Sequence, residues 1–224
     1  MAKLKLDARA LSLRPADEIL KESEAFFINE GKVHTTLKRL IRDLEDEGIP
    51  YAVIGDMALN LWGYTRENVV VDILLTKEGL EQFRNRLVGR GYVRAFAGAL
   101  KTFRNAETQV KVEIITSGEY PGDGKPKAVV FPDPAAARHD RDGYWIVTLE
   151  KLIELKLASG LSAPHRMRDL VDVQELIRIL DLPIELAEQL DGSVRAEYQR
   201  LWGLAHYEDD GPQEREKKQA AAIS

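Results

Sequence analysis

The stretch 50-PYAVIGDMALNLWGYTRENVVVDILLT-76 decides the fold. It opens with a short apolar run at residues 51–54 and closes with a second at residues 69–75, and such runs are typical of buried strands. Between them, Gly55 stops the first strand, and the apolar residues that follow recur at helical spacing. The stretch therefore predicts a strand, a short helix with Asp56 as its N-cap, and a second strand.

The flanking sequence extends this pattern. Helical spacing of apolar residues predicts helices at residues 32–47 and 77–88, the second with Thr76 as its N-cap. Short apolar or alternating runs predict further strands at residues 92–96, 101–105, 109–115, 129–131 and 145–147. From Thr148 to His206 the pattern is helical. We therefore expect an α/β (α+β) fold, with a mixed β-sheet flanked by helices and an α-helical C-terminal portion.

This pattern divides the 224 residues into four parts. Residues 1–31 form an N-terminal extension, residues 32–147 the α/β domain and residues 148–207 a C-terminal helical region. Residues 208–224 contain few apolar side chains, which predicts a disordered tail.

The composition excludes several classes of protein. The chain has no cysteine, so a disulfide framework, a thiolate zinc site and a cysteine nucleophile are excluded. No apolar run approaches the roughly 20 residues of a membrane helix, and the N-terminus lacks the apolar core of a signal peptide. With 32 Lys and Arg against 37 Asp and Glu, the net charge is −5, which gives no strong signal for DNA binding. We expect a cytoplasmic protein without a membrane partner.

The deciding stretch resembles the core of the minimal nucleotidyltransferases of the polymerase-beta type. In that family a strand ends in a glycine pair, a short helix and an Arg-x-Thr segment follow, and the next strand carries Asp-x-Asp. Here Gly55 and Asp56 stand at the glycine pair, Arg66 at the arginine, Asn68 at the threonine and Asp72 at the second aspartate.

The resemblance continues to about residue 180. The third acid of the family matches Glu113 in 112-VEIIT-116, and the helical segment after the catalytic domain matches residues 150–176. That segment supplies Lys156, Arg166, Arg168, Asp169 and Asp172. Bacterial proteins of this type often form one half of a toxin–antitoxin or defence pair.

The resemblance implies transfer of a nucleoside monophosphate from a nucleoside triphosphate to a protein or RNA acceptor by two Mg²⁺ ions. Asp72 and Glu113 would be the catalytic residues and the metal ligands, because acids on one face of neighbouring strands can share a metal. The residues expected to bind the nucleotide are Gly55, Asp56, Arg66, Asn68 and Lys156.

Two positions depart from the family pattern. Val70 stands where the first aspartate of Asp-x-Asp is expected, so one metal ligand is missing. Asp56 places a negative charge where the family presents a small residue to the phosphates. The sequence therefore leaves two functions open. The protein is a transferase with a weakened Mg²⁺ site, or it is a non-catalytic nucleotide-binding or regulatory module.

Several of these residues also have a purely structural interpretation. Asp56 is a good N-cap, Glu113 alternates with apolar neighbours and can face water, and Lys156 can extend its ammonium to solvent. Arg66 is placed to pair with Asp72 or with a phosphate.

The helical region has structural interpretations too. Its charged residues 165–172 are typical of helix capping and salt bridges, which we favour over a nucleotide site. Its leucines can pack within the chain or build a homodimer. The glycine-rich loop at residues 122–125 lacks the ending of a P-loop, and we expect it near the active face.

Overall fold

The computed structural model describes residues 13–20, 30–67 and 69–207. Asn68, the tail at residues 208–224 and most of the N-terminal extension lie outside the described residues, so the predictions for them stay predictions. The boundaries at residues 31 and 147 are likewise predictions.

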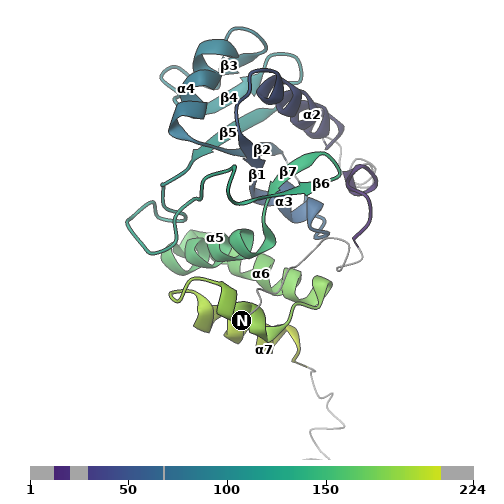
Figure 1. Ribbon diagram of the computed structural model, residues 1–224, viewed down its shortest axis with the longest axis vertical. Helices are drawn as coiled ribbons and strands as arrows, with labels where there is room; N and C mark the ends of the chain where they lie inside the picture. Colours follow the sequence, from purple (N-terminus) through teal and green to yellow (C-terminus); the bar gives the residue numbers. More distant parts are fainter. Residues whose placement is uncertain (1–12, 21–29, 68, 208–224) are drawn as a thin grey trace, which may run out of the picture.

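Within the described residues, seven strands form one mixed sheet in the order β3-β4-β5-β2-β1-β7-β6 (Figure 1). The strands are β1 (Tyr51–Val53), β2 (Val70–Leu75), β3 (Tyr92–Arg94), β4 (Thr102–Asn105), β5 (Lys111–Thr116), β6 (Arg138–Arg141) and β7 (Tyr144–Val147). At the centre of the sheet, β2 runs antiparallel to β1 and parallel to β5. The predicted mixed α/β class is confirmed.

The helices lie around this sheet and below it in Figure 1. They are α2 (Glu30–Asp46), α3 (Gly55–Leu61), α4 (Lys77–Arg86), α5 (Leu149–Ser162), α6 (Met167–Leu180) and α7 (Arg195–Ala205), with 3-10 turns η1 (Pro164–Arg166) and η2 (Ile184–Gln189). The C-terminal helices α5, α6 and α7 stack on one another beside the sheet, as the helical pattern after Thr148 predicts. The N-cap of α4 is Thr76, as predicted, and its hydroxyl accepts a hydrogen bond from the Gly79 N–H at 2.9 Å.

Helices α2 and α4 cover one face of the sheet. Phe83 of α4 packs against the rings of Tyr92 and Phe103, and the Tyr92 hydroxyl donates to Asp43 of α2 at 2.9 Å. Phe103 pairs with Val112 in the ladder, so these apolar residues share the covered face. Alternate residues of β2 and β5 therefore project toward the opposite face, where α3 and α5 lie.

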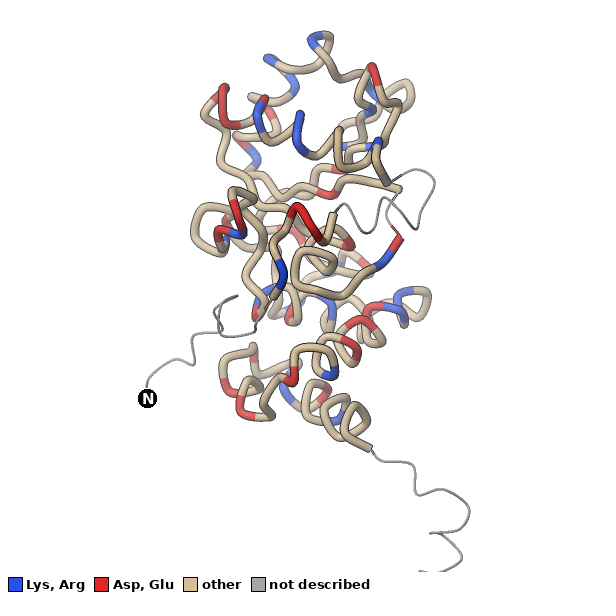
Figure 2. The backbone as a smooth tube through the Cα atoms, turned by 90° about the vertical axis from the view of Figure 1, so that its right-hand side faces the viewer, with Lys and Arg blue, Asp and Glu red and all other residues tan. Residues whose placement is uncertain are grey.

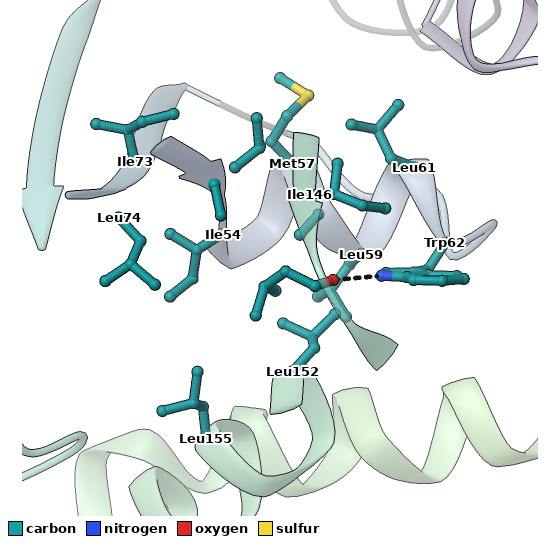
Figure 3. Packing of buried hydrophobic residues seen from close by; sticks show 14 of the residues in the cluster. Ile54, Met57, Leu59, Leu61, Trp62, Ile73, Leu74, Ile146, Leu152 and Leu155 are labelled. Carbon is teal, nitrogen blue, oxygen red and sulfur yellow. Dashed lines mark hydrogen bonds between the residues drawn. The ribbon is translucent and has the colours of Figure 1, made fainter. Parts of the chain in front are cut away.

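The opposite face is packed around α3 (Figure 3). The Trp62 indole at the end of α3 is buried and donates to the Val147 carbonyl at 3.1 Å. Leu152 and Leu155 of α5 pack toward Ile54 from below. One continuous apolar cluster thus joins the sheet to the helical region. Most of the C-terminal apolar residues predicted to pack within the chain belong to it or pack against it, namely Leu180, Leu182, Leu186, Leu190, Leu201 and Trp202, whereas Ile184 and Leu204 are exposed.

Two details of the strand pattern differ from the sequence prediction. Residues 129–131 belong to no strand, although the Phe131 N–H donates to the Glu119 carbonyl at 2.8 Å. Conversely, β6 forms from Arg138–Arg141, whose sequence RHDR has no apolar alternation. It is an edge strand with only one neighbour, so few apolar side chains are needed there.

In the part of the chain that is described, no helix combines the length and the apolar character needed to cross a bilayer.

Candidate active site

Two acidic side chains lie next to each other on the face opposite α2 and α4. Asp72 of β2 and Glu113 of β5 are direct partners in the parallel ladder, so both project from the same face. Both line a pocket with a volume of about 350 Å³. The pocket is also lined by the start of α3, by α5 and η1, and by the loop between β5 and β6. The structure therefore brings together the two acids that the sequence predicts as metal ligands.

A glycine allows α3 to start directly beside Asp72. Gly55 has a φ of +69°, and a Cβ on it would overlap the Asp72 carboxylate and lie 3.0 Å from the Asp72 Cβ. The neighbouring Ile54 N–H donates to the Asp72 carbonyl at 3.2 Å. Gly55 is thus required by the space next to the acid and by its own backbone conformation.

The surroundings of Asp72 favour its protonated form. Burial is the main cause that raises the pKa of Asp72 to about 7, and the neighbouring charges of Glu113 and Asp56 raise it further. Lys156 and Lys111 act in the opposite direction. Two carboxylates that repel each other in this way favour a bound cation, because a cation relieves the repulsion.

Glu113 does not simply face water. It is partly exposed toward the pocket, and its carboxylate forms an ion pair with the Lys111 ammonium on the same face of β5. Lys111 is not part of the family pattern that the sequence resembles. Its signal in the sequence is its position two residues before Glu113, which places both side chains on one face of a strand.

The opposite wall of the pocket is formed by α5, η1 and the start of α6. Lys156, Ser159, His165, Arg166 and Asp169 line it. The Arg166 Nε donates to Asp169 Oδ2 at 2.8 Å and to Ser159 Oγ at 3.1 Å. The predicted salt bridge within residues 165–172 is therefore present between Arg166 and Asp169 and forms part of the pocket wall. The predicted capping is wrong, because the N-caps of η1 and α6 make no side-chain capping bond.

Lys156 is the centre of a buried charge cluster. Its ammonium lies 2.9 Å from Asp169 Oδ1, 2.7 Å from Asp172 Oδ2 and 3.3 Å from Asp56 Oδ1. Burial opposes its charge, but these carboxylates outweigh burial and raise the pKa of Lys156. The interpretation that Lys156 extends its ammonium into solvent is wrong, because only 7% of the residue is exposed and the charge is satisfied inside.

Arg66 belongs to the same cluster. Its Nη1 lies 2.5 Å from Asp172 Oδ1 and 3.3 Å from Asp56 Oδ1. The side chain of Asn60 holds the backbone of Arg66 in place, because it accepts from the Arg66 N–H at 2.6 Å and donates to the Arg66 carbonyl at 2.9 Å. The sequence placed Arg66 beside Asp72 or a phosphate, but the structure pairs it with Asp172 on α6.

Asp56 is not the N-cap of α3. The N-cap is Ile54, which makes no side-chain capping bond, and Asp56 lies in the first helical turn. Its carboxylate accepts from Lys156 and Arg66 and is not among the groups that line the pocket. The predicted repulsion between Asp56 and a phosphate is therefore offset by two adjacent cations.

A loop between β5 and β6 closes the remaining side of the pocket. Tyr120, Pro121, Gly122 and Phe131 line it. Gly122 lies so close to α5 that a Cβ would be 2.8 Å from the Ser159 carbonyl oxygen. The glycine-rich loop that the sequence places near the active face does lie at the pocket, and its aromatic neighbours are residues that the sequence analysis missed.

The acidic pair fits one magnesium ion better than two. Among the described residues, no group of three or more His, Cys, Asp or Glu side chains could hold a metal ion. Asp72 and Glu113 are two carboxylates, and Mg²⁺ is commonly bound by one or two carboxylates together with substrate phosphates. The nearby Asp56 is already bound to Lys156 and Arg66.

Comparison with solved structures gives distant similarities. Over 85% of this chain and 97% of the other, the structure is similar to JHP933 from Helicobacter pylori, with 16% sequence identity and a TM-score of 0.42. Over 77% of this chain and 93% of the other, it is similar to a candidate nucleotidyltransferase from H. pylori, with 18% identity and a TM-score of 0.43. No protein-family model and no curated protein matches the chain. Similarity at this level carries no functional argument, so a function must be inferred from the geometry of the site.

The contact between Gly55 and Asp72 can be tested against a matched glycine. Gly48 has nearly the same φ, +65° against +69°, but nothing lies within 4 Å of a Cβ added there. Both Gly48→Ala and Gly55→Ala should lose about 1 kcal/mol to backbone strain. Gly55→Ala should lose a further amount of about 1–3 kcal/mol from overlap with Asp72. Urea unfolding measures both, and equal losses would contradict the proposed contact.

Asp72 should make the stability of the metal-free protein depend on pH. Its pKa is raised from 3.8 to about 7, so the folded state keeps a proton that the unfolded chain releases. The stability from this proton is complete below the unfolded pKa and is lost as pH rises through the folded pKa, at up to about 1.4 kcal/mol per pH unit. Urea unfolding in EDTA at about pH 4.5 and about pH 8 should show Asp72→Asn gaining stability relative to the unmodified protein at the higher pH. A difference that is the same at both pH values would refute this assignment.

Removal of the Lys156 charge should destabilise the fold strongly. Lys156→Met leaves buried carboxylates uncompensated, so the expected loss is about 3–5 kcal/mol of unfolding free energy. Arg200→Ala is the control, because it breaks the exposed pair with Glu197 and should cost less than about 1 kcal/mol. Similar losses for the two variants, measured by urea unfolding, would show that Lys156 does not hold the cluster together.

Proposed function

We propose that the pocket binds a nucleoside triphosphate with one magnesium ion, and that the protein is a nucleotidyltransferase with a weakened metal site. One observation carries this proposal. The acidic pair Asp72 and Glu113 faces, across a pocket of about 350 Å³, a wall that carries Lys156, His165 and Arg166. Acids on one side suit a cation, and basic groups on the other suit the phosphates that share it.

Each wall would have a distinct task. Asp72 and Glu113 would hold the ion, which when bound neutralises phosphate charge and polarises the phosphoryl group. Arg166, on the exposed side of the cluster, would orient the phosphates. Lys156 is already surrounded by carboxylates, so its main task would be to fix α5 against α3.

The loop side of the pocket suits a nucleobase. Tyr120 and Phe131 line it, and aromatic rings stack on bases. Figure 2 shows acidic and basic residues interspersed along the described chain. A small anionic ligand in the pocket agrees better with this distribution than a long nucleic acid bound along the surface. A protein or RNA acceptor would then meet the nucleotide at the mouth of the pocket.

A second candidate function is a non-catalytic nucleotide-binding module, such as one half of a toxin–antitoxin or defence pair. The observation that favours it is Val70, which faces the same side as Asp72 and adds no carboxylate to the acidic pair. With two carboxylates instead of three, nucleotide binding can persist while transfer is lost.

The two candidates can be separated by binding and transfer measurements on the full chain. We expect Mg²⁺-dependent binding of at least one nucleoside triphosphate, measured by calorimetry, and a loss of about tenfold or more in Asp72→Asn and Glu113→Gln. Label from α-³²P-labelled nucleotides should pass to the protein itself, to added protein or to RNA. Arg200→Ala should behave like the unmodified protein, because its pair lies outside the pocket.

Binding without transfer to any acceptor would favour the non-catalytic module. Absence of binding for all nucleotides, or binding that is unchanged in Asp72→Asn, would refute both candidates.

A further inference from the structure

Lys111 stands beside the acidic pair at the start of β5. The parallel ladder pairs Val70 with Lys111 and Asp72 with Glu113. Because residues two apart on a strand share a face, all four side chains project to the same side of the sheet. They form a compact group of one apolar, one basic and two acidic side chains.

The Lys111 ammonium already interacts with this group. It forms an ion pair with Glu113, and its charge lowers the pKa of Asp72 against the dominant effects of burial and the neighbouring acids. The side chains of Lys111 and Glu113 are 36% and 40% exposed, so both remain accessible from solvent. A lysine ammonium is a compact, fixed positive charge.

The same face has no acid at position 70. A carboxylate there would stand two residues from Asp72 and directly opposite Lys111. With Val70 in that place, Lys111 has Glu113 as its nearby acid on this face, and the acidic pair has only two charges with which to hold cations.

We propose that the Lys111 ammonium supplies the positive charge that a second metal ion would otherwise bring, so that the site takes one divalent cation. This inference rests on the proposed function. Val70 and Lys111 are direct partners in the ladder, so the Lys111 ammonium would form an ion pair with an acid placed at position 70. That acid would then not be available to a metal ion. Val70→Asp alone consequently adds no metal site, and a second ion requires removal of Lys111 as well.

The test counts Mn²⁺ ions on the full chain by electron paramagnetic resonance, in the presence of a non-hydrolysable ATP analogue. We expect one tightly bound ion in the unmodified protein and one in Val70→Asp. Val70→Asp combined with Lys111→Ala should bind two. Lys111→Ala alone should bind one ion with roughly tenfold higher affinity, because a neighbouring positive charge is removed.

Lys77→Ala is the matched control, since it removes an exposed lysine at the start of α4 and should leave the count and the affinity unchanged. Circular dichroism of each variant verifies folding, and the two single-site measurements stand even where the double variant does not fold.

The outcomes separate the two proposals. If the unmodified protein binds no Mn²⁺ with or without the nucleotide, the proposed function fails. If it binds two ions, the role of Lys111 is refuted together with the single-ion part of the proposed function, while nucleotide binding stands. If Val70→Asp alone gains a second ion, the role of Lys111 is refuted and the proposed function stands. Unchanged Mn²⁺ affinity in Lys111→Ala would also overturn it.

Discussion

The rest of the structure depends on the buried ammonium of Lys156. It joins Asp56, which follows the first strand, to Asp169 and Asp172 on α6, and thereby ties the sheet to the helical region. An ammonium of this kind is costly to bury unless acids surround it, and the acids are equally costly without it. The ion pairs therefore favour one position of the C-terminal helices on the sheet. Apolar packing around Leu152 and Leu155 is less specific, because apolar contacts have no fixed direction.

This arrangement also determines which acids remain for a ligand. Asp56, Asp169 and Asp172 are bound to Lys156, and Arg66 and Arg166 complete their pairing. Asp72 and Glu113 lie on the other side of the pocket, where Lys111 is their nearby cation from the sheet. The neighbouring acids are neutralised by their own partners, so Asp72 and Glu113 are the carboxylates that the proposed function assigns to a cation.

The sequence predicted those features that depend on neighbours along the chain. Apolar runs located β1, β2 and β5, and the match of Asp72 and Glu113 to a family pattern placed both acids in one site before their ladder partnership was known. The edge strand β6 was missed because a strand with one neighbour needs little apolar alternation. The contact of Arg66 with Asp172 and that of Lys156 with Asp56 were missed because the partners lie 106 and 100 residues apart in the chain. No local pattern encodes such a contact.

Asp56 shows how a local rule can give the wrong role to a residue. The preference of aspartate for N-cap positions predicted Asp56 as the N-cap of α3. The family pattern predicted that its negative charge would repel the phosphates. Its carboxylate in fact lies between Lys156 and Arg66, while Ile54 occupies the N-cap position. Asp56, which the family pattern marks as a disruptive substitution, is therefore part of the ion cluster that lies beside the pocket. Of the two departures from the family pattern, Val70 is the one that lowers the number of acids on the face of β2 and β5 that carries Asp72 and Glu113.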